Sequence, residues 1–521
     1  MGLKNTAVLV LMMGALSFAC DGVEMVEPAD GGAAEDDAGR LGDAGSGEDA
    51  GSLDDAGSGD DAGSLADAGS LADAGPTGDA GSDAGSSDAG TDGGPSGFMP
   101  CVEAGRPLPV VPCGEGFGMQ TPAGSGRHLD PPSTTVHRVT TLAADGPGSL
   151  AACAEASGPR VCVFEVSGII ERTEYLQISD PYITIAGQTA PSPGISIHGA
   201  GIHIETTDVL ISHLRIRVGD RPDGPPVHNR DAIRISDRDN DPRRIVIDHC
   251  SLAFSSDEMV SVWYEAGDVT LYETLMGHPL NDSIHVDEGA SGTAPHGFGA
   301  LFGQESDRVA MVRSVLVHQQ SRNPLSRADG LVMLNNLVYG WGDTVTTLAS
   351  VSGSINRATV VGNVYVPGPD SSERPPIKVN SLPSGSEVFI LDNVHPDMTS
   401  DPWALVEGSS SRRVGSPPVV YDGYAPRSTT GLQEALLAGV GAWPSARDAV
   451  DQRLIREVRE QTGRIINCVE DDGSSRCNRN AGGWPTLAEN TRTLTLPARP
   501  DEDDHGDGYT NLEAWLYSFA P

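Results

Sequence analysis

The sequence predicts an all-β chain whose main domain is a parallel β-helix, and three observations support this. Short β-branched triplets recur at intervals of roughly 22 to 40 residues between positions 181 and 394, a spacing typical of the coils of a β-solenoid. Helical periodicity is nearly absent over this range. Few Asn-Gly or Asp-Gly pairs separate the triplets, whereas a β-sandwich would need such tight hairpins.

The triplets share a common continuation. Several are followed by a small polar turn and a second apolar pair, as in Ile247–Leu252, Met333–Val338 and Val361–Tyr365. We therefore expect inward side chains of successive coils to stack and polar turn residues to bond along the stack. The eight triplets begin at Ile183, Val209, Ile245, Val269, Val309, Leu331, Thr359 and Val388.

Other elements are expected on either side of the repeat. Strand-like runs begin at Val136, and Ser149 can cap a short helix over Leu150–Glu155. Apolar residues at helical spacing predict a helix over Asp448–Thr462. The tail Asn511–Tyr517 predicts a short helix that lies back on the solenoid.

Composition divides the chain into five segments. We expect a signal peptide at 1–19, an acidic low-complexity linker at 20–97, an entry segment at 98–135, the β-helix at 136–400 and a C-terminal extension packing on the solenoid at 401–521. The linker repeats Asp-Ala-Gly-Ser and holds 20 acidic residues against one Arg, about half of the formal charge of −39. Such a segment cannot bury enough apolar surface to fold. It predicts a disordered tether with a reach of roughly 50 Å.

The first twenty residues predict export. Lys4 precedes the apolar run Ala7–Met13, and this run is too short to span a bilayer as a mature anchor. The following Leu16–Cys20 resembles the lipobox of bacterial lipoproteins, which implies a lipid on Cys20. Ordinary signal cleavage nearby is the alternative. The expected location is extracellular or at the cell surface, on the outer membrane of a bacterium.

Cysteine spacing fits an oxidising compartment. Besides Cys20 the chain has seven cysteines, and six of them form close pairs in the sequence. Cys250, which has apolar neighbours, is expected to be a lone buried thiol in a strand. The disulfides expected from spacing alone are Cys101–Cys113, Cys153–Cys162 and Cys468–Cys477.

Several short blocks stand in a fixed order between Val163 and Gly368. They are Val166–Ile170, Ile183–Pro191, Asp231–Ile233, Ile245–Ser251, Asp257-Glu258, His296–Gly299, Ser321–Pro324 and Asn335–Tyr339. In this order and spacing they resemble the pectate lyase family of right-handed parallel β-helix enzymes. The resemblance implies β-elimination of an acidic polysaccharide, polygalacturonate or pectin, by a monomer. It implies no nucleic-acid partner and no membrane contact beyond the lipid anchor.

The resemblance also implies a Ca²⁺ cofactor. A hard dication neutralises the C6 carboxylate of the substrate and makes the neighbouring C5 proton more acidic. The family's acidic ligand positions fall on Asp231 and Asp257, with Asn229 at a third position and Ser261 at a fourth. The last two carry no charge, and Glu258 is close enough in sequence to substitute. The alternative is a set of solvated turn acids without a metal.

Two arginines bracket a proline in Ser321–Arg327. Arg322 falls at the family's proton-abstracting arginine, and Arg327 at a second arginine that binds the substrate acid group. Because the ordinary pKa of an arginine is about 12.5 or higher, an arginine base predicts a rate that rises into the alkaline range. Alternatively, both side chains only bind a polyanion.

The chain departs from the family at one substrate-binding position. A lysine found in many members falls near Phe298, and no Lys occurs between Met259 and Asp343. We expect His285 or His296 to contribute to binding instead, and Phe298 to stack on a sugar ring. In the family, the equivalents of Asp248 and His249 are mainly structural. The acidic tail at 501–508 does not fit the EF-hand spacing, so a structural Ca²⁺ or a solvated turn both remain open.

Two other functions compete with the lyase. A glycoside hydrolase on the same solenoid needs two suitably spaced carboxylates, and Asp231 with Asp257 meets that need but leaves the arginines without a role. A noncatalytic polysaccharide-binding lipoprotein fits the uncharged ligand positions and the missing lysine.

Overall fold

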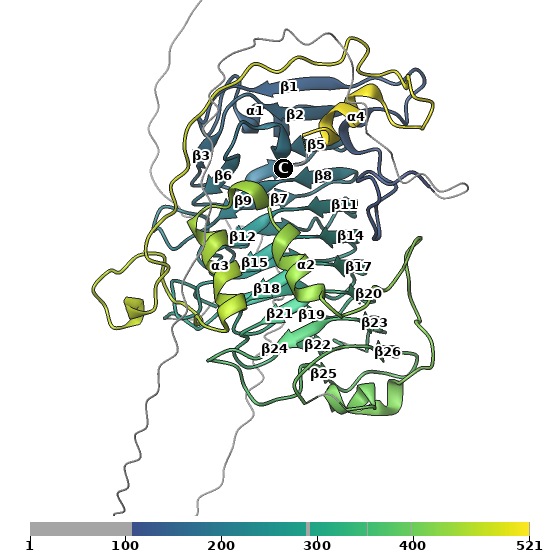
Figure 1. Ribbon diagram of the computed structural model, residues 1–521, viewed down its shortest axis with the longest axis vertical. Helices are drawn as coiled ribbons and strands as arrows, with labels where there is room; N and C mark the ends of the chain where they lie inside the picture. Colours follow the sequence, from purple (N-terminus) through teal and green to yellow (C-terminus); the bar gives the residue numbers. More distant parts are fainter. Residues whose placement is uncertain (1–106, 288–291, 352, 398, 520–521) are drawn as a thin grey trace, which may run out of the picture. The chain divides into compact units, whose positions relative to one another are not determined.

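The computed structural model describes residues 107–287, 292–351, 353–397 and 399–519. Three parallel sheets of ten, nine and eight strands form this part of the chain, and from β2 to β25 each coil contributes one strand to each sheet (Figure 1). The predicted parallel β-helix is confirmed. The predicted signal peptide, acidic linker and Cys20 lie outside the described residues, as does Cys101.

The ten-stranded sheet runs through β1 (Thr135–Val139), β2 (Arg160–Phe164), β5 (Ile183–Ala186), β8 (Val209–Ser212), β11 (Arg243–Asp248), β14 (Gly267–Tyr272), β17 (Asp307–Val312), β20 (Asp329–Leu334), β23 (Arg357–Val361) and β26 (Glu387–Leu391). The eight-stranded sheet runs through β3 (Gly168–Glu171), β6 (Ile195–His198), β9 (Leu214–Arg217), β12 (Ser251–Ala253), β15 (Leu275–Gly277), β18 (Val315–Val317), β21 (Leu337–Tyr339) and β24 (Val364–Val366). The nine-stranded sheet runs through β4 (Leu176–Ile178), β7 (Ile202–Ile204), β10 (Ile233–Ile235), β13 (Glu258–Val262), β16 (Phe298–Phe302), β19 (Leu325–Ser326), β22 (Thr346–Leu348), β25 (Ile377–Val379) and β27 (Val406–Gly408).

Stacked side chains fill the interior, as the triplets predict. Ile183 pairs with Val209 and Val209 with Ile245, and all three are fully buried. Polar turns stack in the same way: Nδ2 of Asn336 donates to Oδ1 of Asn363 at 2.9 Å, and Asn363 donates likewise to Asn393 at 2.9 Å. Such ladders pair polar groups that would otherwise be buried without a partner.

Four α-helices are described: α1 (Leu150–Ala154), α2 (Leu432–Gly439), α3 (Ala449–Glu460) and α4 (Asn511–Tyr517). The 3₁₀ helices are η1 (Ala123–Ser125), η2 (Gly187–Thr189), η3 (Pro402–Leu405), η4 (Ser410–Arg412), η5 (Pro444–Ala446) and η6 (Arg476–Asn478). The three predicted helices correspond to α1, α3 and α4 and are confirmed, whereas α2 was not predicted. No described helix is long and apolar enough to cross a membrane.

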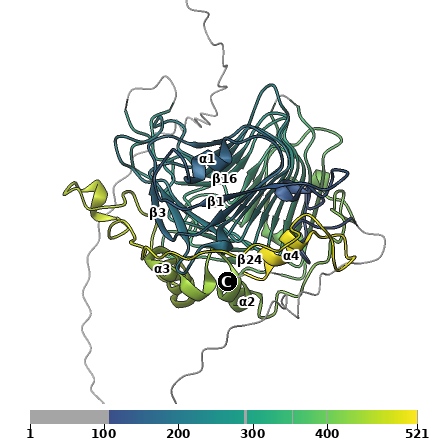
Figure 2. The same cartoon turned by 90° about the horizontal axis from the view of Figure 1, so that it is seen from above.

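The C-terminal helices cover two sheets. α2 and α3 lie across the eight-stranded sheet (Figures 1 and 2), and Leu436 and Leu454 pack there with Leu275 and Val315. A side chain at Gly277 would collide with Leu454, so this strand needs glycine for the helix to approach. α4 packs through apolar side chains on the first strands of the ten-stranded sheet.

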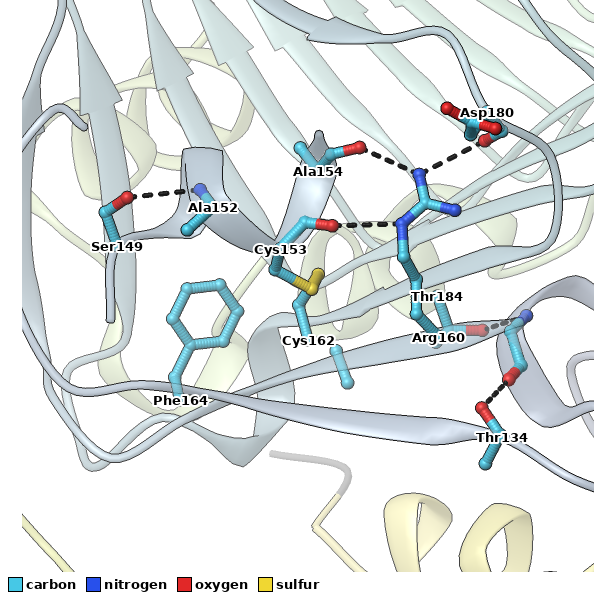
Figure 3. Close-up of a disulfide and its surroundings, with 12 residues drawn as sticks. Thr134, Ser149, Ala152, Cys153, Ala154, Arg160, Cys162, Phe164, Asp180 and Thr184 are labelled. Atoms are coloured by element: carbon cyan, nitrogen blue, oxygen red, sulfur yellow. Dashed lines mark hydrogen bonds between the residues drawn. A yellow bond between two sulfur atoms is a disulfide. The ribbon is translucent and has the colours of Figure 1, made fainter. Parts of the chain in front are cut away.

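α1 closes the first coil of the solenoid. The Ser149 side chain caps this helix, and the disulfide Cys153–Cys162 ties it to β2 (Figure 3). The fully buried guanidinium of Arg160 donates five hydrogen bonds to main-chain carbonyls, including those of Cys153 and Ala154. Burial lowers the pKa of Arg160 to about 10.

The other cysteines also follow the spacing. Cys468–Cys477 is a disulfide, and Cys250 is free and buried. Cys113 is disulfide-bonded as well, while its predicted partner Cys101 lies outside the described residues.

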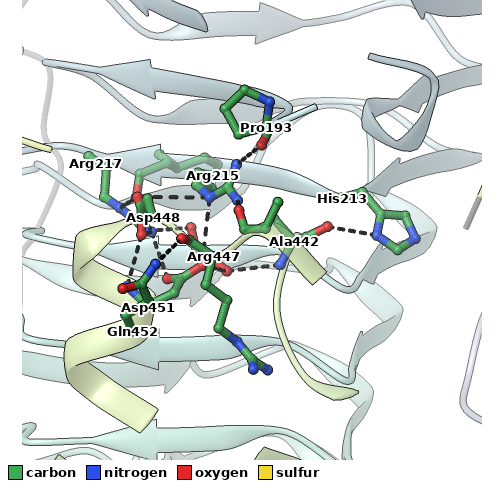
Figure 4. A network of polar contacts seen from close by, with 12 residues as sticks. Pro193, His213, Arg215, Arg217, Ala442, Arg447, Asp448, Asp451 and Gln452 are labelled. Atoms are coloured by element: carbon green, nitrogen blue, oxygen red, sulfur yellow. Dashed lines mark hydrogen bonds and ion pairs between the residues drawn. The ribbon is translucent and has the colours of Figure 1, made fainter. Parts of the chain in front are cut away.

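A charged network lies under α3. Arg217 donates to Asp448 at 3.0 Å and to Asp451 at 2.7 Å, and Arg215 donates to the carbonyls of Pro193 and Ala446 (Figure 4). Asp448 also caps α3 by accepting from the main chain of Asp451. Two guanidinium groups thus face two carboxylates, and the charges balance.

Candidate active site

The candidate site lies along the nine-stranded sheet, where its strands begin. Ser261 of β13 pairs with Arg234 of β10. The residues on either side of each are buried in the core, so both side chains point to the outer side of the sheet. At the start of the next pair of strands, Glu258 pairs with Phe298. Phe298 in turn bridges Ser321, directly before Arg322.

Three carboxylates converge at this place. Asp231, Asp257 and Glu258, here called the acid triad, each place an oxygen within 4.8 Å of the other two. All three side chains are buried. Burial and the neighbouring carboxylates raise the pKa of Asp231 and of Asp257 well above its ordinary value. The triad therefore carries more negative than positive charge, and a divalent cation would balance it.

Neighbouring groups hold Asp231 in place. Its carboxylate accepts from the Ser261 hydroxyl at 2.8 Å and from the main chain of Glu258 at 3.1 Å. Its main-chain N–H donates to the Tyr175 hydroxyl at 2.9 Å, and that hydroxyl donates to the carbonyl of Asn229 at 2.8 Å. Ser261 and Asn229, both predicted as ligands, thus help to position Asp231.

Arg322 reaches the acid triad. Its guanidinium donates to Glu258 and lies 4.3 Å from the centre of the Phe298 ring. Burial alone would raise the pKa of Glu258, but Arg322 outweighs this effect and holds the pKa well below its ordinary range. The backbone of Arg322 is left-handed, with φ of 60°. Its carbonyl would collide with any side chain at Gly299.

Arg327 stands further along the same sheet. It directly follows β19, and its main-chain N–H donates to the carbonyl of Phe302 at 2.7 Å. Ser326 before it is buried in the core, so strand alternation places Arg327 on the outer side. The two predicted arginines therefore lie on one face, with Arg322 in contact with the triad.

Two histidines complete the site. His296 places Nε2 at 3.1 Å from Oδ1 of Asp257. Its ring stacks on that of His285, with centroids 3.8 Å apart, and also contacts the Phe298 ring at 4.0 Å. Burial and the neighbouring His296 lower the pKa of His285 to about 4. The predicted substrate-binding residues His296 and Phe298 thus contact each other, and His296 also contacts Asp257.

Sequence reasoning missed two residues. Tyr175 lies 56 residues before Asp231, in a coil further up the stack, so no local pattern points to it. Arg234 follows Asp231 by three residues on the outer side, and its charge opposes the raised pKa of Asp231 and Asp257. The available signal was its place directly after the block Asp231–Ile233.

Asp248 and His249 lie elsewhere. His249 contacts Asp248 at 2.7 Å and Glu273 at 2.8 Å, at the corner between the ten- and eight-stranded sheets. Burial opposes the charged form of His249, but the two carboxylates outweigh it and raise its pKa to about 10. Within the described part of the chain, none of these contacts reaches the acid triad.

The acidic tail folds onto itself. Asp503 accepts main-chain N–H groups from Gly506, Asp507 and Gly508, while Arg499 pairs with Asp504. These carboxylates organise a turn, and the choice between a structural Ca²⁺ and a solvated turn stays open.

No family model matches the chain. Proteins named "Probable pectate lyase C" match it with 28% identity, over 429 residues in Aspergillus terreus and 431 residues in Aspergillus flavus. Each match covers 78% of this chain and 93% of the relative. The predicted resemblance to pectate lyases is confirmed.

Solved structures of similar proteins include a pectate lyase from Bacillus sp. N165 in complex with trigalacturonate. It is 15% identical, and the match covers 63% of this chain and 98% of that one with a TM-score of 0.44. The major allergen from cedar pollen is 15% identical, with coverage of 62% and 91% and a TM-score of 0.40. The fold of this chain rests on its own strand pairing.

Proposed function

We propose that the protein is a polysaccharide lyase that cleaves polygalacturonate by β-elimination with the help of Ca²⁺. The observation that carries the proposal is the contact of the Arg322 guanidinium with the acid triad. A cation site and a candidate base thereby lie within reach of one sugar residue. The similarity to pectate lyases over 78% of the chain supports the substrate class.

The acid triad suits a hard dication. Ca²⁺ prefers several oxygen ligands in flexible geometry, and Asp231, Asp257 and Glu258 offer three carboxylates within 4.8 Å of one another. When bound, Ca²⁺ would neutralise the substrate carboxylate and so make the adjacent C5 proton more acidic. Asn229 and Ser261 support Asp231 rather than adding charge.

The arginines and the aromatic ring act on the substrate. Arg322, after losing one proton to solvent at alkaline pH, takes the C5 proton; the electron pair forms the C4–C5 double bond, and the C4–O bond to the next sugar breaks. The leaving oxygen takes a proton from water. Arg327 binds a neighbouring substrate carboxylate, since guanidinium pairs well with carboxylate. The Phe298 ring packs against the Arg322 guanidinium, and its exposed part contacts a sugar ring of the substrate. His296 orients Asp257.

We also propose that the enzyme acts outside the cell as a monomer on an N-terminal lipid anchor. The support is Leu16–Cys20 together with the acidic linker, which would hold the β-helix away from the membrane. The Aspergillus relatives are fungal and lend no support to a bacterial anchor. Incorporation of radiolabelled palmitate tests the lipid anchor. We expect label in the wild type but not in Cys20→Ala, and equal labelling would refute the anchor.

One assay tests the activity. The full chain is incubated with polygalacturonate, with and without a chelator, and the ultraviolet absorbance of the unsaturated product is followed. We expect absorbance that rises faster at alkaline pH, stops with chelator, returns with Ca²⁺ and is lost in Asp231→Ala. New reducing ends without absorbance would instead indicate a hydrolase. Binding with neither signal would indicate a noncatalytic polysaccharide-binding protein.

A further inference from the structure

A second group of potential metal ligands adjoins the acid triad. Asp257, His285 and His296 each place one ligand atom within 4.8 Å of the other two. Nε2 of His296 lies 3.1 Å from Oδ1 of Asp257, and the two imidazole rings are nearly parallel at 17°. Asp257 thus belongs both to an all-carboxylate group and to a group with two imidazoles.

His285 has the arrangement of a metal-ligating histidine. Its side chain is 4% exposed, and Nε2 faces Oδ1 of Asp287 at 3.3 Å. Its Nδ1 is buried, and no hydrogen-bond partner lies within reach among the described residues. Histidine ligands commonly donate one ring N–H to a carboxylate, which leaves the lone pair of the other nitrogen for the metal. A buried nitrogen without a partner is otherwise unfavourable.

We propose that Asp257, His285 and His296 bind a divalent transition-metal ion such as Zn²⁺ or Co²⁺. Two imidazoles and a carboxylate suit these ions, whereas Ca²⁺ takes oxygen ligands. Zn–N bonds of about 2.0–2.1 Å in a tetrahedron place ligand atoms about 3.3 Å apart. The ligand atoms lie up to 4.8 Å apart without a metal, so binding requires the His296 side chain, which is 15% exposed, to move closer to the other two.

The other histidine group differs at His249, which has no free ring nitrogen. His213, Asp248 and His249 also lie within 4.8 Å of one another. However, both ring nitrogens of His249 face carboxylates, at 2.7 and 2.8 Å, and Nδ1 of His213 bonds the carbonyl of Ala442 at 2.9 Å. His249 is thus held between two carboxylates, and this group serves as the control.

Sharing of Asp257 couples the two groups. A transition metal that takes Asp257 withdraws one carboxylate from the acid triad and so weakens Ca²⁺ binding. We therefore expect Zn²⁺ to antagonise Ca²⁺ and to slow the lyase, a consequence that rests on the proposed function. The binding of the transition metal itself does not rest on it.

Cobalt titration tests the site directly. The full chain, freed of metal, is titrated with Co²⁺ and followed by visible absorption, which reports tetrahedral imidazole coordination. We expect His285→Gln and His296→Gln each to weaken binding at least roughly tenfold, and His213→Gln and His249→Gln to leave it unchanged. Equal binding in the wild type and both site variants would overturn the proposal, as would loss in the control variants alone. Because His296 is partly exposed, its variant keeps the test decisive even if His285→Gln does not fold.

Calorimetry separates this proposal from the proposed function. Asp257→Asn should weaken both Co²⁺ and Ca²⁺ binding, while His285→Gln should weaken Co²⁺ binding only. If the wild type has no lyase activity but shows this pattern, the metal site stands and the proposed function falls. If the enzyme is active and both variants bind Co²⁺ like the wild type, the metal site falls and the lyase stands.

Discussion

Two places on the solenoid gather buried charges, and they differ in balance. Under α3, Arg215 and Arg217 face Asp448 and Asp451, and a helix covers all four (Figure 4). On the nine-stranded sheet, three carboxylates share one directly bonded guanidinium, that of Arg322. Under α3, the arginines lower the pKa of Asp448, although burial alone would raise it, while burial and Asp448 raise the pKa of Asp451. In the acid triad, Arg322 lowers the pKa of Glu258, although burial alone would raise it, while burial and the neighbouring carboxylates raise the pKa of Asp231 and Asp257. The two clusters thus differ in their count of charges, two against two and three against one.

The difference separates a structural ion network from a site that needs a ligand. A buried network with matched charges is complete by itself, and removing one member leaves an uncompensated charge. A buried cluster with excess negative charge is complete only with a proton or a cation. Charge balance is therefore a better guide to function here than the density of ionisable residues.

The largest expected effect comes from Arg322→Lys. Loss of a positioned proton acceptor typically costs about 10²- to 10⁴-fold in rate, so kcat on polygalacturonate should fall by that order while the unfolding midpoint changes little. The matched control is Arg357→Lys, since Arg357 pairs with Asp329 on the exposed side of the ten-stranded sheet. Unchanged kcat in Arg322→Lys would remove Arg322 from the chemistry.

Arg217→Met should lower the stability of the protein and leave its activity unchanged. It leaves Asp448 and Asp451 buried with only Arg215 nearby, and breaking such a pair costs about 3–5 kcal/mol. Chemical denaturation should show this loss, while kcat of the folded fraction stays unchanged. A stable Arg217→Met variant with impaired kcat would contradict the division between the two clusters.

Stability should depend on His249 in the alkaline range. Its folded pKa of about 10 lies above the ordinary value of 6.5 because Asp248 and Glu273 outweigh burial. The stabilisation is therefore complete below pH 6.5 and declines as pH rises toward 10. Denaturation series of the wild type and His249→Gln should differ in slope between these values, with the variant flatter. Parallel curves would show that His249 is not held charged.

Phe298→Ala should have the smallest effect. A cation–π contact at a partly exposed site contributes about 0.5–1 kcal/mol. We expect KM to rise up to roughly fivefold, with kcat reduced less than in Arg322→Lys. A variant in which kcat falls as far as in Arg322→Lys would show that the ring is needed to place the guanidinium.

The fold was largely predictable, but unevenly. All eight sequence triplets fall in the ten-stranded sheet, whose strands are continuous and fully buried on the core side. The nine-stranded sheet gave no comparable signal, because most of its strands have only two or three residues and some carry outward charges such as Arg234 and Lys378. The sheet that carries the site is thus the one that periodicity identifies least well.

Only those residues of the candidate site that lie in short blocks of the sequence were predictable. The resemblance identified the acids and arginines, and the structure brings Asp231, Asp257, Glu258 and Arg322 together. Tyr175 and the free nitrogen of His285 could not be predicted, because both depend on how coils are stacked rather than on neighbours in sequence.

The closed first coil has a consequence for association between molecules. A parallel solenoid ends in an uncovered set of strand groups that can template pairing with another chain. Here α1 contacts the first strands, and Arg160 donates to the main-chain carbonyls of Cys153, Pro181 and Asp180. The disulfide Cys153–Cys162 keeps α1 attached to β2. We expect these three parts, which complete the core at this end, to make it a poorer template for pairing with a second molecule.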